Sequence, residues 1–162
     1  MRLSFLCVPL ALAACSPSAE PEAPEETQAT SAPAPIARPR AALSPEDIEG
    51  AALTGELGCS FNEGEGDAPL LVAMADVRDE AIAEGVLKLG PSALSLRADA
   101  PGGFNELVDG ARFTSGDLTA AIAVTSPKPL GGGESPPRAA TLTLESEALA
   151  PQQIEGRWTC GP

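Results

Sequence analysis

The sequence predicts an all-β fold, a small antiparallel β-barrel or sandwich with a short N-terminal helix. Two observations predict it. Apolar residues alternate with polar residues in several separate stretches, which is the period-2 pattern of strands with one buried face. Clusters of Gly, Pro, Asn and Asp separate these stretches, at residues 62–67, 99–103 and 127–137, and such clusters mark turns. The domain is expected over residues 44–162, preceded by a signal peptide and a disordered linker.

The first element of this domain is a helix that begins after Ser44 and ends near Ala52. Ser44 is a good N-cap residue, Pro45 suits the first turn, and Asp47 places an acid at the third helical position. Together they form a capping pattern that satisfies free amide groups at a helix start. Everything after this helix is expected to be β-structure.

The expected strands are recognised by apolar residues at every second position. The alternating sets are Leu57, Cys59 and Phe61; Leu94, Leu96 and Ala98; Leu118, Ala120, Ile122 and Val124; Leu142 and Leu144; and Ile154, Trp158 and Cys160. Residues 70–77 carry apolar side chains on both faces of the expected strand, which predicts a central strand. About seven or eight short strands fit either a barrel or a sandwich, and the pattern does not decide between the two.

The N-terminus, MRLSFLCVPLALAAC, has the parts of a signal peptide. Arg2 supplies the positive region, and residues 3–11 form an apolar region too short to cross a bilayer as a helix. The segment 12–15, Leu-Ala-Ala-Cys, resembles the bacterial lipobox. That resemblance implies that residues 1–14 are removed and that Cys15 is lipidated, with fatty acids such as palmitate. The alternative is an ordinary signal peptide followed by a chance cysteine.

By resemblance to Gram-negative lipoproteins, Ser16 after the lipidated cysteine implies transfer to the outer membrane, facing the periplasm. Residues 15–43 would then form the lipidated end and a tether. The tether is rich in Pro, Ala and Glu, a composition that cannot bury enough apolar surface to fold. Its full reach is about 85 Å at ~3.1 Å per residue.

Cys59 and Cys160 are the cysteines that remain after Cys7 is removed and Cys15 is lipidated. The compartment beyond the inner membrane is oxidising, so the pair is expected to form a disulfide between the first and last strands. Trp158 should pack beside it. A reactive redox pair is the alternative, but the Cys-x-x-Cys spacing and an activating His are both missing.

Composition argues against several function classes. The formal charge is −13, which repels phosphate backbones, so no nucleic-acid partner is expected. The chain has no His, and His supplies the base of Ser-His-Asp sites and many zinc ligands. Neither a cofactor nor a metal is expected, and the chain is not expected to be an enzyme.

Several short motifs have both a chemical and a structural interpretation. The loop Asn62–Asp67 offers oxygen ligands for calcium, but the acid pattern fails after Asp67 and a solvated hairpin loop is favoured. Lys88 and Lys128 are the lysines available for Ser-Lys catalysis; one is flanked by leucines and the other by prolines. The acidic pair Glu145 and Glu147 is expected to lie on the outward face of its strand, without the desolvation that a general acid needs.

The segment 109–114, Asp-Gly-Ala-Arg-Phe-Thr, suggests a binding loop. With the lipobox, the all-β pattern and the cysteine pair, it resembles the membrane-bound inhibitors of c-type lysozyme, which present a Ser-Gly-x-Lys/Arg-Tyr/Phe loop to the enzyme. The resemblance implies that Gly110, Arg112 and Phe113 form that loop, although Asp109 replaces the usual Ser. The structural alternative is a turn that leads into a strand.

The sequence therefore predicts an envelope lipoprotein whose non-catalytic β-domain binds a partner or has a structural role. Its membrane partner is reached through the lipid on Cys15, and an envelope protein is a possible further partner. Residues 156–162 together with 58–61 also resemble uncharacterised envelope lipoproteins, which imply no activity. A periplasmic lysozyme inhibitor is the alternative function, and an enzyme is a more distant one.

Overall fold

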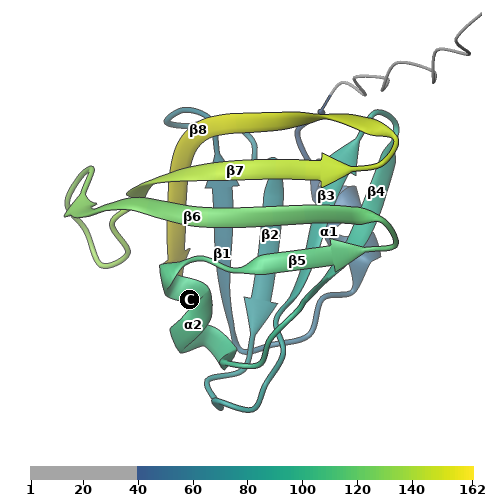
Figure 1. The fold of residues 1–162 in the computed structure, drawn as a ribbon. Coiled ribbons are helices and arrows are strands. Elements are labelled where there is room, and N and C mark those ends of the chain that lie inside the picture. Colours follow the sequence, from purple (N-terminus) through teal and green to yellow (C-terminus); the bar gives the residue numbers. More distant parts are fainter. Residues whose placement is uncertain (1–39) are drawn as a thin grey trace, which may run out of the picture. The chain divides into compact units, whose positions relative to one another are not determined.

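The computed structural model describes residues 40–162, which form a closed barrel of eight antiparallel strands (Figure 1). Each strand pairs with the next along the chain, and the last pairs with the first. The prediction of an all-β domain with an N-terminal helix is confirmed, and the architecture is a barrel. The strands are β1 (Leu57–Asn62), β2 (Leu71–Ala75), β3 (Glu84–Leu89), β4 (Ser92–Ala98), β5 (Arg112–Ser115), β6 (Leu118–Pro129), β7 (Arg138–Ser146) and β8 (Leu149–Gly161).

The strands form two groups whose directions cross, β1–β4 and β5–β8 (Figure 1). β8 joins the groups at one corner, because it pairs with β7 along Leu149–Trp158 and with β1 along Arg157–Gly161. At the other corner β4 and β5 share only two register pairs, Arg97 with Thr114 and Ala98 with Phe113. Strand pairing therefore closes the barrel along many residues where β8 meets β7 and β1, and along only two register pairs where β4 meets β5.

The helix α1 (Pro45–Ala51) has the expected capping box. The Ser44 side chain accepts a hydrogen bond from the Asp47 amide, and the Asp47 carboxylate accepts one from the Ser44 amide at 2.8 Å. The helix contacts β3 and β4. The Lys88 Nζ of β3 donates to Asp47 Oδ2 at 2.6 Å, so the helix is fixed to the outside of the barrel.

A second helix, α2 (Gly103–Asp109), corrects the expectation that only strands follow α1. Its position depends on contacts that are remote in sequence. Leu107 is buried in the core, and the Phe104 amide donates to the Asp76 carbonyl at 2.8 Å. Gly103 has φ +57°, and a Cβ there would lie 2.2 Å from the Arg78 carbonyl oxygen, so a glycine is required.

Residues 40–43 correct the boundary between the predicted tether and the domain. The Leu43 amide donates to the Pro69 carbonyl at 2.7 Å, and the Leu43 side chain is 3% exposed. Arg40 forms a β-bridge with Leu89 at the end of β3. The ordered domain therefore includes residues that the composition assigns to the tether. The predicted signal peptide and the tether up to residue 39 lie outside the described residues.

The strand expected over residues 70–77 is shorter in the structure. β2 covers Leu71–Ala75 and lies between β1 and β3, as a central strand should. Val77 follows the strand and is 50% exposed, so the apolar run continues beyond the strand that it predicts.

Apolar side chains fill the interior of the barrel. Most of the alternating positions predicted to face inward do so, but Leu57 is only half-buried and is not part of the core. The largest fully buried side chains are Trp158, Phe61 and Phe113. Among the described residues, no buried side-chain nitrogen or oxygen lacks a hydrogen-bond partner. Eight-stranded barrels can be filled by side chains or can hold one small ligand, and this barrel is of the filled kind.

Candidate functional site

The disulfide joins the two strands that close the barrel. Cys59 of β1 and Cys160 of β8 are direct register partners with a Cα–Cα distance of 4.0 Å, and their sulfur atoms are bonded. The predicted disulfide is confirmed. Cys59 is buried and Cys160 is half-buried. The link lies at the barrel wall, where both cysteines line a surface hollow of about 380 Å³.

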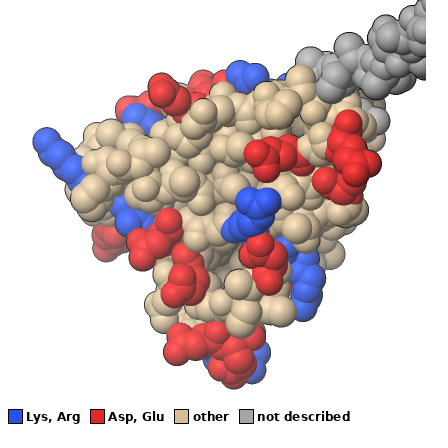
Figure 2. All heavy atoms as spheres, viewed as in Figure 1, with Lys and Arg blue, Asp and Glu red and all other residues tan. Residues whose placement is uncertain are grey.

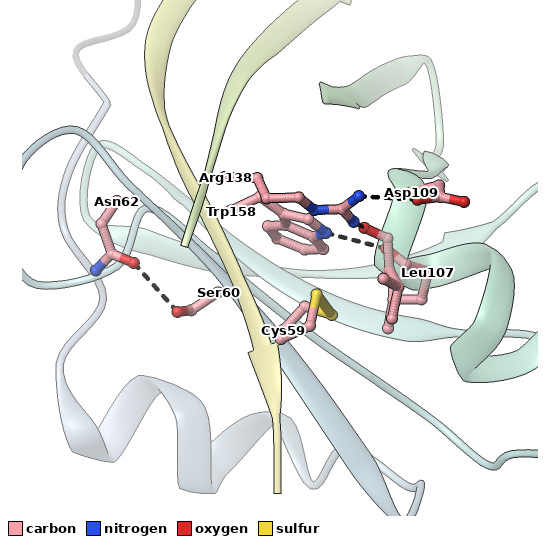
Figure 3. The surroundings of a disulfide bond; sticks show 9 residues. Cys59, Ser60, Asn62, Leu107, Asp109, Arg138 and Trp158 are labelled. Carbon is pink, nitrogen blue, oxygen red and sulfur yellow. Dashed lines mark hydrogen bonds and ion pairs between the residues drawn. A yellow bond between two sulfur atoms is a disulfide. The ribbon is translucent and has the colours of Figure 1, made fainter. Parts of the chain in front are cut away.

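Trp158 lies two residues before Cys160 and faces the same way, as predicted. Its Nε1–H donates to the Leu107 carbonyl of α2 at 3.0 Å. Arg138 of β7 reaches the same end of α2, where it donates to the Val108 carbonyl and, at 3.0 Å, to Asp109 Oδ1. Figure 3 shows both side chains directed at the helix. These donors satisfy carbonyl groups that every helix end leaves free, so α2 is fixed to β7 and β8.

The structure separates the residues of the predicted binding loop. Phe113 is fully buried in β5, whereas Arg112 beside it is half exposed on the outer surface. Arg112 lies between two carboxylates, with its Nε 3.6 Å from Asp99 and its Nη2 4.0 Å from Glu145. A folded barrel cannot present Phe113 and Arg112 together to an enzyme cleft, so the exposed-loop geometry implied by the resemblance does not occur here.

Gly110 has a structural reason for being glycine. It ends α2 with φ +107°, and a Cβ would lie 2.4 Å from the Ile122 carbonyl oxygen. The backbones of this turn and of β6 are therefore in close contact, and the Ile122 amide donates to the Ala111 carbonyl at 2.8 Å. This matches the structural alternative, a turn that leads into a strand.

Two carboxylates of the acidic loop between β1 and β2 form ion pairs. Glu63 pairs with Arg40 at 2.6 Å, and Glu65 pairs with Arg157 at 3.3 Å. The Asn62 side-chain Nδ2 donates to the Asp67 backbone carbonyl at 2.7 Å, as in a closed hairpin loop. Within residues 40–162 no three Cys, Asp or Glu side chains are grouped so that they could hold a metal ion.

Of the two lysines considered for catalysis, Lys88 lies beside a hydroxyl group, because its Nζ and the Ser44 Oγ both donate to Asp47 Oδ2, at 2.6 and 2.9 Å. Lys88 is bound to Asp47, and this contact is the main cause that lowers the pKa of Asp47 to about 2. Lys128 is exposed near the end of β6. Hydrogen bonds from Thr54 lower the pKa of Glu84. Both carboxyl groups are thus held in the charged form, the opposite of what a general acid near neutral pH requires.

Surface hollows lie on the outside of the barrel wall. One of about 400 Å³ lies between α2, the β6–β7 loop and the end of β8. Another of about 400 Å³ lies between the end of α1 and β4, and Ser95, Arg97 and Thr114 line it. Figure 2 shows acidic side chains scattered over the visible face with basic ones between them, without a continuous basic stripe.

Cys15, the predicted lipidation site, lies outside the described residues. None of the described helices is long and apolar enough to cross a membrane. The chain matches no protein-family model, no curated protein and no solved structure.

The structure also reveals a surface that the sequence analysis missed. Part of β4 has a strand on one side only, because β5 is short. Alternation within residues 94–98 predicts the buried face of this strand, but it carries no information about which neighbour lies beside it. The only sequence signal was the shortness of the apolar pattern around residues 112–115.

Proposed function

We propose that the chain is a bacterial envelope lipoprotein, anchored through lipid on Cys15 in the outer membrane and facing the periplasm. Its barrel acts there as a non-catalytic module that binds a partner or has a structural role. The lipobox-like segment 12–15 is the basis for the anchor. The observation that carries the proposal is the Cys59–Cys160 disulfide, because such bonds form and persist in oxidising compartments outside the cytoplasm.

The first residues of the barrel limit how far it can stand from the membrane. Arg40 and Leu43 are bound to the barrel, so the tether would extend from residue 16 to residue 39. Its full reach is then about 75 Å at ~3.1 Å per residue. This is enough for the barrel to meet other envelope proteins without leaving its own membrane.

The filled interior supports a role at the outer surface of the barrel. Ligand sites in small barrels are usually cavities inside the barrel or at its mouth, and here the interior is filled by packed apolar side chains. Several surface charges of the described region are engaged in ion pairs with each other. A partner that contacts the outer wall fits this arrangement better than a small substrate inside it.

The anchor can be tested by metabolic labelling with a fatty-acid probe in a bacterial host. The unchanged chain should be labelled and Cys15→Ala should not. Cys7→Ala is the matched control and should keep the label, because Cys7 is removed with the signal peptide. Equal labelling of Cys15→Ala would refute the lipoprotein assignment.

Density-gradient separation of the host membranes tests the location. The labelled protein should fractionate with the outer membrane, and Ser16→Asp should shift it toward the inner membrane, since Ser at this position is the basis for the outer-membrane expectation. Residence of the unchanged protein in the inner membrane would contradict this part of the proposal.

A further inference from the structure

The first half of β4 is paired on one side only. The ladder with β3 runs along the strand from Ser92 to Arg97. The ladder with β5 includes Arg97 and Ala98 and nothing earlier, because β5 ends at Ser115. Residues 92–96 therefore form a free strand edge.

The hydrogen bonds of the neighbouring residues show which groups point off this edge. The Ala98 amide donates toward β3, to the Ala83 carbonyl at 2.9 Å, whereas the Asp99 amide donates toward β5, to the Arg112 carbonyl at 3.0 Å. Backbone groups of successive residues in a strand alternate in direction. Ala93 and Ser95 therefore direct their N–H and C=O groups away from β3, and both residues are exposed.

This edge is short, but it lacks other usual protections against strand addition. Natural edges are blocked by charged side chains, prolines, bulges or a covering loop. Residues 92–96 read Ser-Ala-Leu-Ser-Leu, without charge or proline, and the register with β3 has no shift along them. The end of α1 lies near this edge, because residues 51–54 line a hollow of about 400 Å³ together with Ser95 and Arg97. An extended peptide that pairs with Ala93 and Ser95 would lie beside this hollow.

The two faces beside the edge define the chemistry of such a peptide. On the outer face Arg97 is exposed and takes part in no ion pair within the described region. Its ladder neighbour Glu84 accepts hydrogen bonds from Thr54, and the charge of Arg97 is a smaller cause that lowers the pKa of Glu84. On the inner face Leu94 packs against the core yet remains half-buried. A bound strand would therefore place a carboxylate near Arg97 and an aliphatic side chain beside Leu94.

A second copy of this chain fits the edge less well. The edge sequence has no carboxylate that could face Arg97 of the other copy. Two edges of this length would also bury far less than the ~1,200 Å² typical of stable protein pairs. Peptide binding by strand addition needs only a short edge and neighbouring side-chain contacts.

We propose that the free edge of β4, residues 92–96, binds an extended segment of an envelope protein as an additional antiparallel strand. The segment carries an acidic residue on its outer side and aliphatic residues on its inner side. This proposal rests on the binding role proposed above and specifies its surface. It can fail while the lipid labelling of Cys15 succeeds, so the two failures are distinguishable.

The probe is the synthetic peptide acetyl-Thr-Val-Glu-Val-Thr-amide, added to the mature ¹⁵N-labelled protein in detergent micelles. Saturating peptide should slow hydrogen exchange of the Ala93 and Ser95 amides by about tenfold or more. Ser95→Pro removes one edge donor and should weaken binding by about tenfold, whereas Ser95→Ala keeps the donor and should bind within about twofold. Intrinsic fluorescence of Trp158 verifies that each variant is folded.

A peptide with Lys in place of Glu tests the contribution of Arg97 and should bind about tenfold more weakly. Equal binding by folded Ser95→Pro and Ser95→Ala would overturn the proposal, as would peptide-induced shifts confined to another surface. Protection of Ala93 and Ser95 that rises with protein concentration in the absence of peptide would also overturn it, because a second copy would then occupy the edge.

Discussion

Cys59 and Cys160 lie directly opposite each other where the first strand of the barrel meets the last, with their Cα atoms 4.0 Å apart. The bond spans 101 residues of sequence, so it links the two ends of the described domain. A cross-link that closes so long a loop restricts the unfolded chain strongly, by up to ~4.7 kcal/mol in the chain-entropy model.

Replacing both cysteines, Cys59→Ala with Cys160→Ala, should therefore lower the free energy of unfolding by about 2–5 kcal/mol. Urea unfolding monitored by Trp158 fluorescence measures the change. Without reductant, neither cysteine of the folded, unchanged protein should react with an alkylating reagent. Reaction of either one in the folded state would show that the link is not formed in the mature protein.

Phe113→Ala and Arg112→Ala test neighbouring residues that face opposite ways. Phe113 is fully buried, so its truncation should cost about 3–5 kcal/mol of unfolding free energy. Arg112 is half exposed between two carboxylates, and its truncation should change stability by about 0.5 kcal/mol or less. Thermal and urea unfolding of the two variants provide the comparison.

Phe113 and Arg112 also allow a test between the two functions considered for the barrel, with lysozyme inhibition as the measurement. Because Phe113 is inside the core, we expect the purified barrel not to inhibit a basic c-type lysozyme at stoichiometric concentration. Inhibition that is lost in Arg112→Ala, with stability unchanged, would instead support the lysozyme-inhibitor alternative, with a surface that presents Arg112 without Phe113.

The strands were predictable from the sequence because their signal is local. Alternation places Leu118, Ala120 and Ile122 on one face whichever strand lies beside them, and all three are buried. The choice between barrel and sandwich was not predictable in this way. It depends on the pairing of β1 with β8, which join residues far apart in the chain.

The elements that were missed are stabilised by remote partners. α2 is short and has glycine at Gly102 and Gly103, which weakens its local helix signal. It forms because Leu107 enters the core and because Trp158 and Arg138 bind its last carbonyl groups. Residues 40–43 likewise have the composition of a tether, and contacts with residues remote in sequence place them on the barrel. The Leu43 amide donates to Pro69, the Ala41 amide donates to Lys88, and Arg40 forms a bridge with Leu89.

Asp47→Asn should destabilise the domain in a pH-dependent way. The pKa of Asp47 is lowered from 3.8 to about 2 by Lys88 and Ser44. A lowered carboxyl pKa contributes stability that is fully present above the unfolded value and is lost as pH falls through the folded value. The melting temperature of Asp47→Asn should therefore lie below that of the unchanged protein at pH 7, and the gap should close between pH 3.8 and about 2.

Glu49→Gln is the matched control for this prediction. Glu49 lies on the same helix, is exposed, and forms no ion pair with another described residue. Its substitution should leave the pH dependence of the melting temperature unchanged. A gap for Asp47→Asn that stays constant from pH 7 to pH 2 would show that the contact with Lys88 does not stabilise the folded state.

The segment 154–157 of β8, Ile-Glu-Gly-Arg, spells a protease recognition sequence that the folded barrel should protect. Arg157 pairs with Asn62 on one side and with Ala139 on the other, and Ile154 is buried. A protease can bind this stretch only after its hydrogen bonds with β1 and β7 have been broken. Cleavage after Arg157 should therefore occur only from open states, at a rate that rises with urea concentration.

The disulfide gives this cleavage a second readout. In the oxidised protein the fragment 158–162 should stay attached after cleavage, because Cys160 remains bonded to Cys59. Mass spectrometry should detect its release only after reduction. The variant without both cysteines should be cleaved faster at every urea concentration, because it opens more often. Cleavage of the native, oxidised barrel as fast as that of the unfolded chain would mean that the end of β8 is not held between β1 and β7 in solution.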